Sequence, residues 1–198
     1  CSKGLFRQPR EMGDQKPTLR QLLRGFEAFP DLRATCPLGD LVMAGAYPHP
    51  STERLSGALQ IVATSDIPDV PEWRAQVELL FDHVRQLMSF ASAHHVKAPV
   101  QDVWMNGSWE RVVYSQSKPH RNGQPVFHPM VLQPFFECAV DAFFNWKIKA
   151  KNLKFALEWS SMEANYTETR LMNAMTALEN LADTNLEDNE KYLLPVKV

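Results

Sequence analysis

The stretch DVPEWRAQVELLFDHVRQLMSFAS, residues 69–92, decides most of the expected fold. Asp69 and Glu72 stand at the spacing of a capping box, which predicts the start of a helix. Apolar residues then recur at intervals of three and four, namely Trp73, Val77, Leu80, Val84, Leu87 and Ala91. This period predicts a long amphipathic helix that packs against an apolar partner.

The opposite side of this predicted helix is charged. Arg74 and Glu78 are four residues apart, and Asp82 and Arg85 are three apart, so both pairs are expected to form at the outer surface. His83 is expected on the same charged side.

Short β-prone runs flank the helix. Residues 58–64 alternate and contain Ile61 and Val62, which predicts a strand. Residues 100–115 contain two such runs around Asn106 and Gly107, a pair that supplies the positive φ values of a tight hairpin. These segments predict a sheet beside the helix.

The first sixty residues give a different prediction. Residues 18–29 carry apolar side chains at helical spacing and end at Pro30, which predicts a short helix. Residues 30–57 are interrupted by several prolines and glycines, which predicts a loop-rich region.

After Pro129 the pattern becomes helical throughout. A stripe formed by Val131, Phe135, Cys138, Ala139, Ala142 and Trp146 is followed by one formed by Leu153, Ala156, Leu157 and Trp159. The expected fold class is therefore α+β, with a mixed, β-containing part over 1–130 and an all-helical part over 131–198.

A last helix is expected over 166–183. Asn165 and Glu168 have capping-box spacing. The predicted apolar stripe consists of Leu171, Ala174, Met175, Leu178, Leu181 and Ala182. Such a wide stripe needs a partner, either a further C-terminal segment of the same protein or a second copy of the chain, so we expect the chain to be a fragment that associates.

Composition excludes several classes of protein. The chain has 198 residues, 44% of them hydrophobic and 22% charged, with a formal net charge of -2, which is typical of a globular protein without an overall attraction to nucleic acid or anionic membrane. No apolar run is long enough for a membrane span or a signal peptide, and three cysteines form no disulfide framework. A cytoplasmic protein with Cys138 in its core is expected.

Known catalytic patterns are absent from the sequence. There is no phosphate-binding glycine loop, no G-x-S-x-G, no H-E-x-x-H and no pair of C-x-x-C motifs, so we expect neither a metal nor a cofactor. His94 and His95 are adjacent at the predicted helix end, where they are better suited to capping than to metal binding.

Two further features have a functional and a structural interpretation. Lys147, Lys151 and Lys154 could follow an RNA backbone or form an ordinary solvated helix face. Glu179 borders the apolar stripe of the last helix, so it is expected to be half-buried and either paired with a cation or supporting an active site.

The order of segments resembles bacterial proteins with an ApeA-like N-terminal region fused to a HEPN helical domain. The resemblance lies in residues 87–92 before the hairpin, Phe135-Phe136 to Phe144-Asn145-Trp146, and Arg170-Leu171 through Ala177-Leu178-Glu179. It spans roughly residues 55 to 183. On this basis, 1–130 corresponds to the ApeA-like region and 131–198 to the HEPN-like bundle, both partial.

This resemblance implies an anti-phage or toxin-like ribonuclease that cleaves RNA without a metal. The family uses an Arg and a His separated by four to six residues on a late helix, commonly in a dimer. The sequence departs from that pattern, because its nearest match, Arg121 and His128, contains Pro125 and lies in a predicted loop, and no His follows Arg170. Arg170 and Glu179 could only support such a site.

The expected function is therefore part of a HEPN-family defence protein whose catalytic helix lies outside this chain. The chain alone is expected to be inactive. The alternative is a non-catalytic scaffold module that recognises a protein or a ligand.

Overall fold

The structure is a computed structural model, and it describes residues 3–8, 16–26, 31–45, 55–64, 67–92, 95–105, 107–114, 126–145, 156 and 167–185. The chain divides into two compact units, Cys1–Phe144 and Asn145–Val198. It is a mixed α+β protein, as the sequence predicts.

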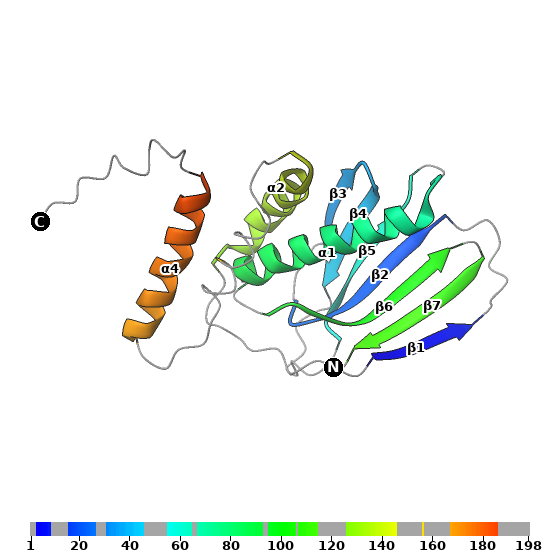
Figure 1. The fold of residues 1–198 in the computed structure, drawn as a ribbon, viewed down its shortest axis with the longest axis horizontal. Coiled ribbons are helices and arrows are strands. Elements are labelled where there is room, and N and C mark those ends of the chain that lie inside the picture. Colours follow the sequence, from blue (N-terminus) through cyan, green and yellow to red (C-terminus); the bar gives the residue numbers. More distant parts are fainter. Residues whose placement is uncertain are drawn as a thin grey trace, which may run out of the picture. The chain divides into compact units, whose positions relative to one another are not determined.

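A seven-stranded antiparallel sheet forms the frame of the first unit, with the strand order β1-β7-β6-β2-β5-β4-β3 (Figure 1). Its strands are β1 Lys3–Gln8, β2 Thr18–Arg24, β3 Leu32–Cys36, β4 Gly39–Gly45, β5 Gly57–Val62, β6 Lys97–Met105 and β7 Ser108–Tyr114. The helical elements are α1 Val70–Ser92, the 3-10 turn η1 Pro129–Val131 and α2 Leu132–Asn145. α1 crosses one face of the sheet, and the core lies between that helix and the strands.

The helix α1 confirms the sequence prediction. The Asp69 side chain accepts a hydrogen bond from the backbone N–H of Glu72 at 3.0 Å, so the predicted cap is present. Trp73 and Val84 belong to the buried face, and the Trp73 indole donates to the Leu38 carbonyl oxygen at 2.8 Å. This bond ties the start of α1 to the β3–β4 turn.

The predicted strand and hairpin are also confirmed. The strand at 58–64 is β5, and the hairpin consists of β6 and β7 with Met105 opposite Ser108. Gly107 has a φ of 70°, the left-handed conformation for which a glycine is favoured at this turn.

The helix predicted over 18–29 is wrong, because residues 18–24 form the strand β2. Leu19 and Leu23 point into the core while Leu22 lies on the other face. β2 pairs with β5 on one side and β6 on the other, and this pairing satisfies its backbone in a way that local spacing cannot reveal.

The loop-rich region predicted over 30–57 contains two strands, β3 and β4. Gly39, at the start of β4, has a φ of 145°, and a Cβ atom there would lie 2.2 Å from the carbonyl oxygen of Val62. Gly39 therefore marks a hairpin turn and close strand packing rather than an absence of structure.

The edge of β3 is covered by a side chain of α2. The Gln133 amide accepts from the Arg33 N–H at 3.0 Å and donates to the Arg33 carbonyl oxygen at 2.7 Å. It thereby satisfies both backbone groups of that residue, as a neighbouring strand would.

The helix α2 belongs to the first unit, whereas the sequence placed the division at residue 130. Three of its buried residues belong to the core of that unit, namely Leu132, Phe136 and Val140, and Ala139 is also buried. Val131 and Cys138, which were predicted to be buried, are exposed. The helix is apolar on several sides, so its period alone could not identify the buried side.

The position of His83 corrects a second prediction. Its Nε2 donates to the carbonyl oxygen of Ala139 at 3.1 Å, and its ring lies 5.7 Å from that of Phe143, so it faces α2 rather than solvent. Burial lowers the pKa of His83, and the bond to Ala139 opposes that shift.

The second unit contains α4, Thr167–Asn185, which confirms the predicted last helix. The predicted apolar stripe is largely uncovered, since Leu171 and Leu178 are 61% and 66% exposed and Met175 is also exposed. Ala177 is buried instead. The helical segment predicted over 148–162 lies outside the described residues, except for Ala156.

We expect the chain to self-associate through this face of α4. Leu178→Asp should lower the apparent mass measured by light scattering, because it places a charge on the exposed apolar stripe. Thr169→Asp adds the same charge at an exposed polar position of the helix and should have little effect. A wild-type chain that is monomeric at every concentration would contradict the expectation.

Candidate functional site

The predicted catalytic pair is not assembled in the described residues. Arg121 lies outside them. His128 is exposed and precedes η1, where its Nδ1 accepts a hydrogen bond from the Met130 N–H at 3.3 Å. Its observed role is to cap that turn.

The structure describes only some of the other predicted site residues. Lys147, Lys151 and Lys154 lie outside the described residues. Arg170 is part of α4, and Glu179 is exposed rather than half-buried as expected, because the helix buries the side that contains Ala177.

No group of His, Cys, Asp and Glu suited to a metal ion occurs among the described residues. Within the same ranges, no helix is long and apolar enough to span a membrane.

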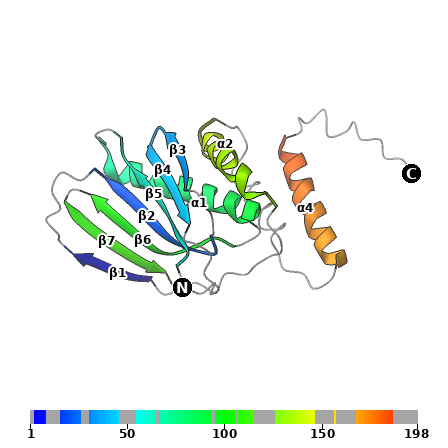
Figure 2. The same cartoon turned by 180° about the vertical axis from the view of Figure 1, so that it is seen from behind.

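The open face of the sheet, opposite α1, carries the most distinctive group of side chains. Figure 2 shows this face, and within the described part of the first unit no helix crosses it. Strand register aligns its residues in rows, because side chains of paired residues point to the same side. The central row contains Val42, Gln60, Arg20, Asp102 and Arg111, and the register continues it to Arg33 on β3 and Phe6 on β1.

Asp102 is the centre of this row. It is fully buried, and it accepts three hydrogen bonds from two arginines. Arg20 Nη2 donates to Oδ2 at 3.0 Å, while Arg111 Nε donates to Oδ1 at 2.6 Å and its Nη2 to Oδ2 at 2.9 Å. Burial raises the pKa of the Asp102 carboxyl, but the bonds from Arg111 and Arg20 outweigh burial and set the pKa below its usual value.

Each arginine also covers a tryptophan ring. The guanidinium carbon of Arg20 lies 4.7 Å from the ring centre of Trp104, and that of Arg111 lies 5.0 Å from the ring centre of Trp109. The two tryptophans are paired across β6 and β7. We call these five residues the Arg–Trp cluster: Arg20, Trp104, Asp102, Trp109 and Arg111.

The Arg–Trp cluster remains accessible to a ligand. The arginine side chains are 33% and 36% exposed, and both tryptophans are half-buried. Two guanidinium groups against one carboxylate leave a single positive charge. A cationic, aromatic surface on an open sheet can attract an anion and stack a planar group.

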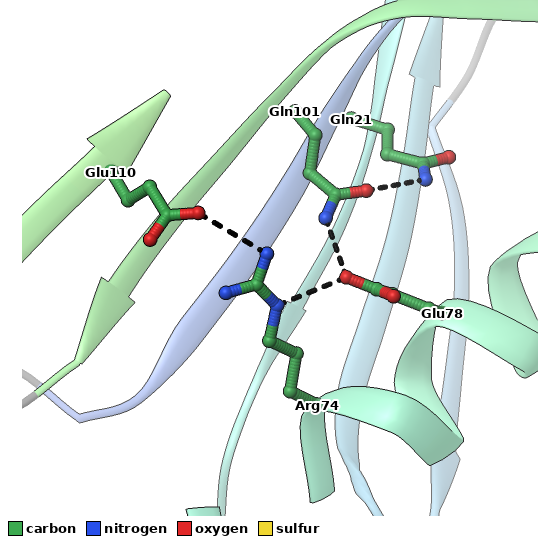
Figure 3. Close-up of polar contacts among 5 residues, drawn as sticks. All are labelled: Gln21, Arg74, Glu78, Gln101 and Glu110. Carbon is green, nitrogen blue, oxygen red and sulfur yellow. Dashed lines mark hydrogen bonds and ion pairs between the residues drawn. The ribbon is translucent and has the colours of Figure 1, made fainter. Parts of the chain in front are cut away.

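A second polar network lies on the helix side of the same strands (Figure 3). Gln21 donates to Gln101 at 2.9 Å, and Gln101 donates to Glu78 at 2.7 Å. Arg74 donates to Glu78 at 3.0 Å and to Glu110 at 3.3 Å. We call this group of five residues the helix-side network.

The ion pairs predicted along α1 are confirmed, Arg74 with Glu78 and Asp82 with Arg85. The first pair does not lie on a purely solvated face as expected. It points toward β6 and β7, because the polar side chains of Gln101 and Glu110 provide partners there.

The sequence contained only part of the signal for the Arg–Trp cluster. A two-residue turn between Met105 and Ser108 pairs Trp104 with Trp109 and Asp102 with Arg111, so the hairpin alone could have identified these four residues. Arg20 could not be identified, because its segment was predicted to be a helix.

Comparison with protein-family models, curated proteins and solved structures finds no match for this chain. The site must therefore be interpreted from its chemistry.

Proposed function

We propose that this chain is the RNA-recognising part of a HEPN-type RNA-cleaving protein, and that the Arg–Trp cluster binds single-stranded RNA. The observation that carries the proposal is the pair of arginines stacked on paired tryptophans on an open sheet face. Aromatic rings on a sheet can stack unpaired bases, while guanidinium groups contact phosphates.

Single-stranded RNA suits this surface better than duplex RNA. The bases of a duplex are stacked on one another and present no free ring face to Trp104 or Trp109. Arg20 and Arg111 are held in place by Asp102, so they meet a ligand in a defined orientation. The resemblance seen in the sequence favours RNA as the nucleic acid.

The first test is binding of a fluorescein-labelled, unstructured RNA oligonucleotide to the full chain, measured by fluorescence anisotropy. Trp109→Ala should weaken binding roughly 5- to 150-fold, since stacking on an aromatic residue contributes about 1–3 kcal/mol per base. Trp109→Phe retains an aromatic ring and should lose much less affinity for the RNA.

Two further comparisons separate this surface from general charge effects. Arg33→Ala removes an exposed arginine at the β3 edge and should leave binding unchanged. Two phosphate contacts predict that log K falls with log salt with a slope of about -1.4. Equal binding by Trp109→Ala and wild type would contradict the proposal, and a chain that binds no RNA would favour the scaffold alternative.

We also expect that the chain does not cleave RNA by itself. The sequences of α2 and α4 contain no histidine, so neither helix can present an Arg and a His together. Incubation of the purified chain with total RNA, followed by gel electrophoresis, tests this. Cleavage that disappears in His128→Ala would show that the pair formed by Arg121 and His128 is catalytic.

A further inference from the structure

The two polar networks lie back to back on the same three strands. The Arg–Trp cluster takes one central-row residue from each of β2, β6 and β7. The helix-side network takes the chain neighbours of those residues, Gln21, Gln101 and Glu110. Successive side chains of a strand point to opposite faces, so each of the three strands carries members of both networks.

Glu78 sets the direction of hydrogen bonding in the helix-side network. An ionised carboxylate only accepts, so the Gln101 amide must turn its Nε2 toward Glu78 and its Oε1 toward Gln21. Arg74 Nε donates to the same Glu78 oxygen, Oε1, and so also holds that carboxylate in place. Gln101 is only 2% exposed, so any displacement would leave a buried amide without partners.

Side chains on both faces of β6 therefore hold the strand at the same point along its length. Gln101 and Asp102 are consecutive residues joined by a planar peptide, and both are buried and hydrogen-bonded through their side chains. Any displacement of Gln101 therefore also displaces Asp102. The position of Asp102 in turn sets where Arg20 and Arg111 lie over the tryptophan rings.

We propose that Gln101 and Glu78 are positioning residues for the RNA-binding face. They hold β6 so that Asp102 keeps both arginines stacked on the two tryptophans. The inference rests on the function proposed for the Arg–Trp cluster, and it assigns a role in that function to residues on the opposite side of the sheet.

The test compares Gln101→Met with Val84→Ala. Gln101→Met preserves volume but removes the amide, whereas Val84→Ala destabilises α1 at a buried position that takes no part in the network. Gln101→Met should weaken RNA binding about 2- to 30-fold, the range expected for coupling between sites that do not touch. Val84→Ala should leave RNA affinity unchanged once the chain is folded.

A second readout needs no RNA. The Nε–H of Arg111 donates to Asp102 at 2.6 Å, so its NMR resonance should be shifted and slow to exchange with water. Gln101→Met should move this resonance and speed its exchange, and Val84→Ala should do neither. Glu78→Gln, a milder change at a side chain that is partly exposed, should act in the same direction if Gln101→Met does not fold.

The outcomes distinguish the two proposals. Absence of RNA binding by the wild type overturns the proposed function, while the Arg111 resonance still shows whether Gln101 positions that arginine. Unchanged RNA affinity together with an unchanged Arg111 resonance in Gln101→Met overturns the positioning role. Equal losses of RNA affinity in Gln101→Met and Val84→Ala, with no change at Arg111, would also overturn it.

Discussion

Replacing Phe136 by alanine is expected to lower the free energy of unfolding of the first unit by about 3 to 5 kcal/mol. Phe136 is fully buried in the core formed by the sheet and α1. Its removal leaves a cavity and also loosens the contact that holds α2 to the unit. Urea denaturation of the full chain, followed by circular dichroism, measures the loss.

The matched control for this prediction is Val131→Ala. Val131 lies five residues earlier and is 43% exposed, so its truncation should change stability by less than about 0.5 kcal/mol. Similar small losses for both variants would mean that α2 is not part of the folding unit, and would favour the expected division at residue 130.

Asp102→Asn should lower the free energy of unfolding by about 2 to 3 kcal/mol. Breaking a buried ion pair by removing one partner typically costs roughly 3 to 5 kcal/mol. Here Arg20 and Arg111 are each about one third exposed, so water can replace part of the hydrogen bonding that they lose. The amide also cannot accept all three hydrogen bonds as a carboxylate does.

The same carboxyl group gives stability a defined dependence on pH. The pKa of Asp102 is lower in the folded chain than its usual value of 3.8, so the unfolded chain binds the proton more readily. Its stabilising contribution is therefore complete above that value and is lost as the pH falls through the folded pKa. Asp102→Asn should remove this part of the acid dependence.

Urea midpoints measured between pH 7 and pH 3 test both statements. Asp40→Asn is the control, because Asp40 is exposed and bonds only Thr35 among the side chains that the structure describes. A loss for Asp102→Asn no larger than that for Asp40→Asn would contradict a central role for the buried carboxylate.

Several elements could be predicted because their signals are local. The cap formed by Asp69 and Glu72, together with a helical period, identified α1 correctly. Asn106 and Gly107 identified the hairpin, and alternation identified β5. In the helix and the hairpin, neighbouring residues contain both the pattern and the cap or turn that bounds the element.

Other elements depended on partners that are distant in the sequence. β2 has apolar residues that fit a helix as well as a strand, and only pairing with β5 and β6 decides between them. The buried side of α2 depended on where the sheet edge and α1 lie. Cys138 was therefore placed in the core when it is exposed, and His83 was placed in solvent when it contacts α2.

The candidate site shows the same division. The sequence by itself determined that Asp102 and Trp104 alternate along β6 and that a tight turn brings β7 back beside them. Only the tertiary structure brought Arg20 to Asp102, across 82 positions of the chain. It also placed α1 on the opposite face of the sheet, where Glu78 accepts a hydrogen bond from Gln101. The physical reason is that the alternation of side chains along a strand fixes which residues share a face. Burial and pairing between distant segments decide which other elements each face contacts.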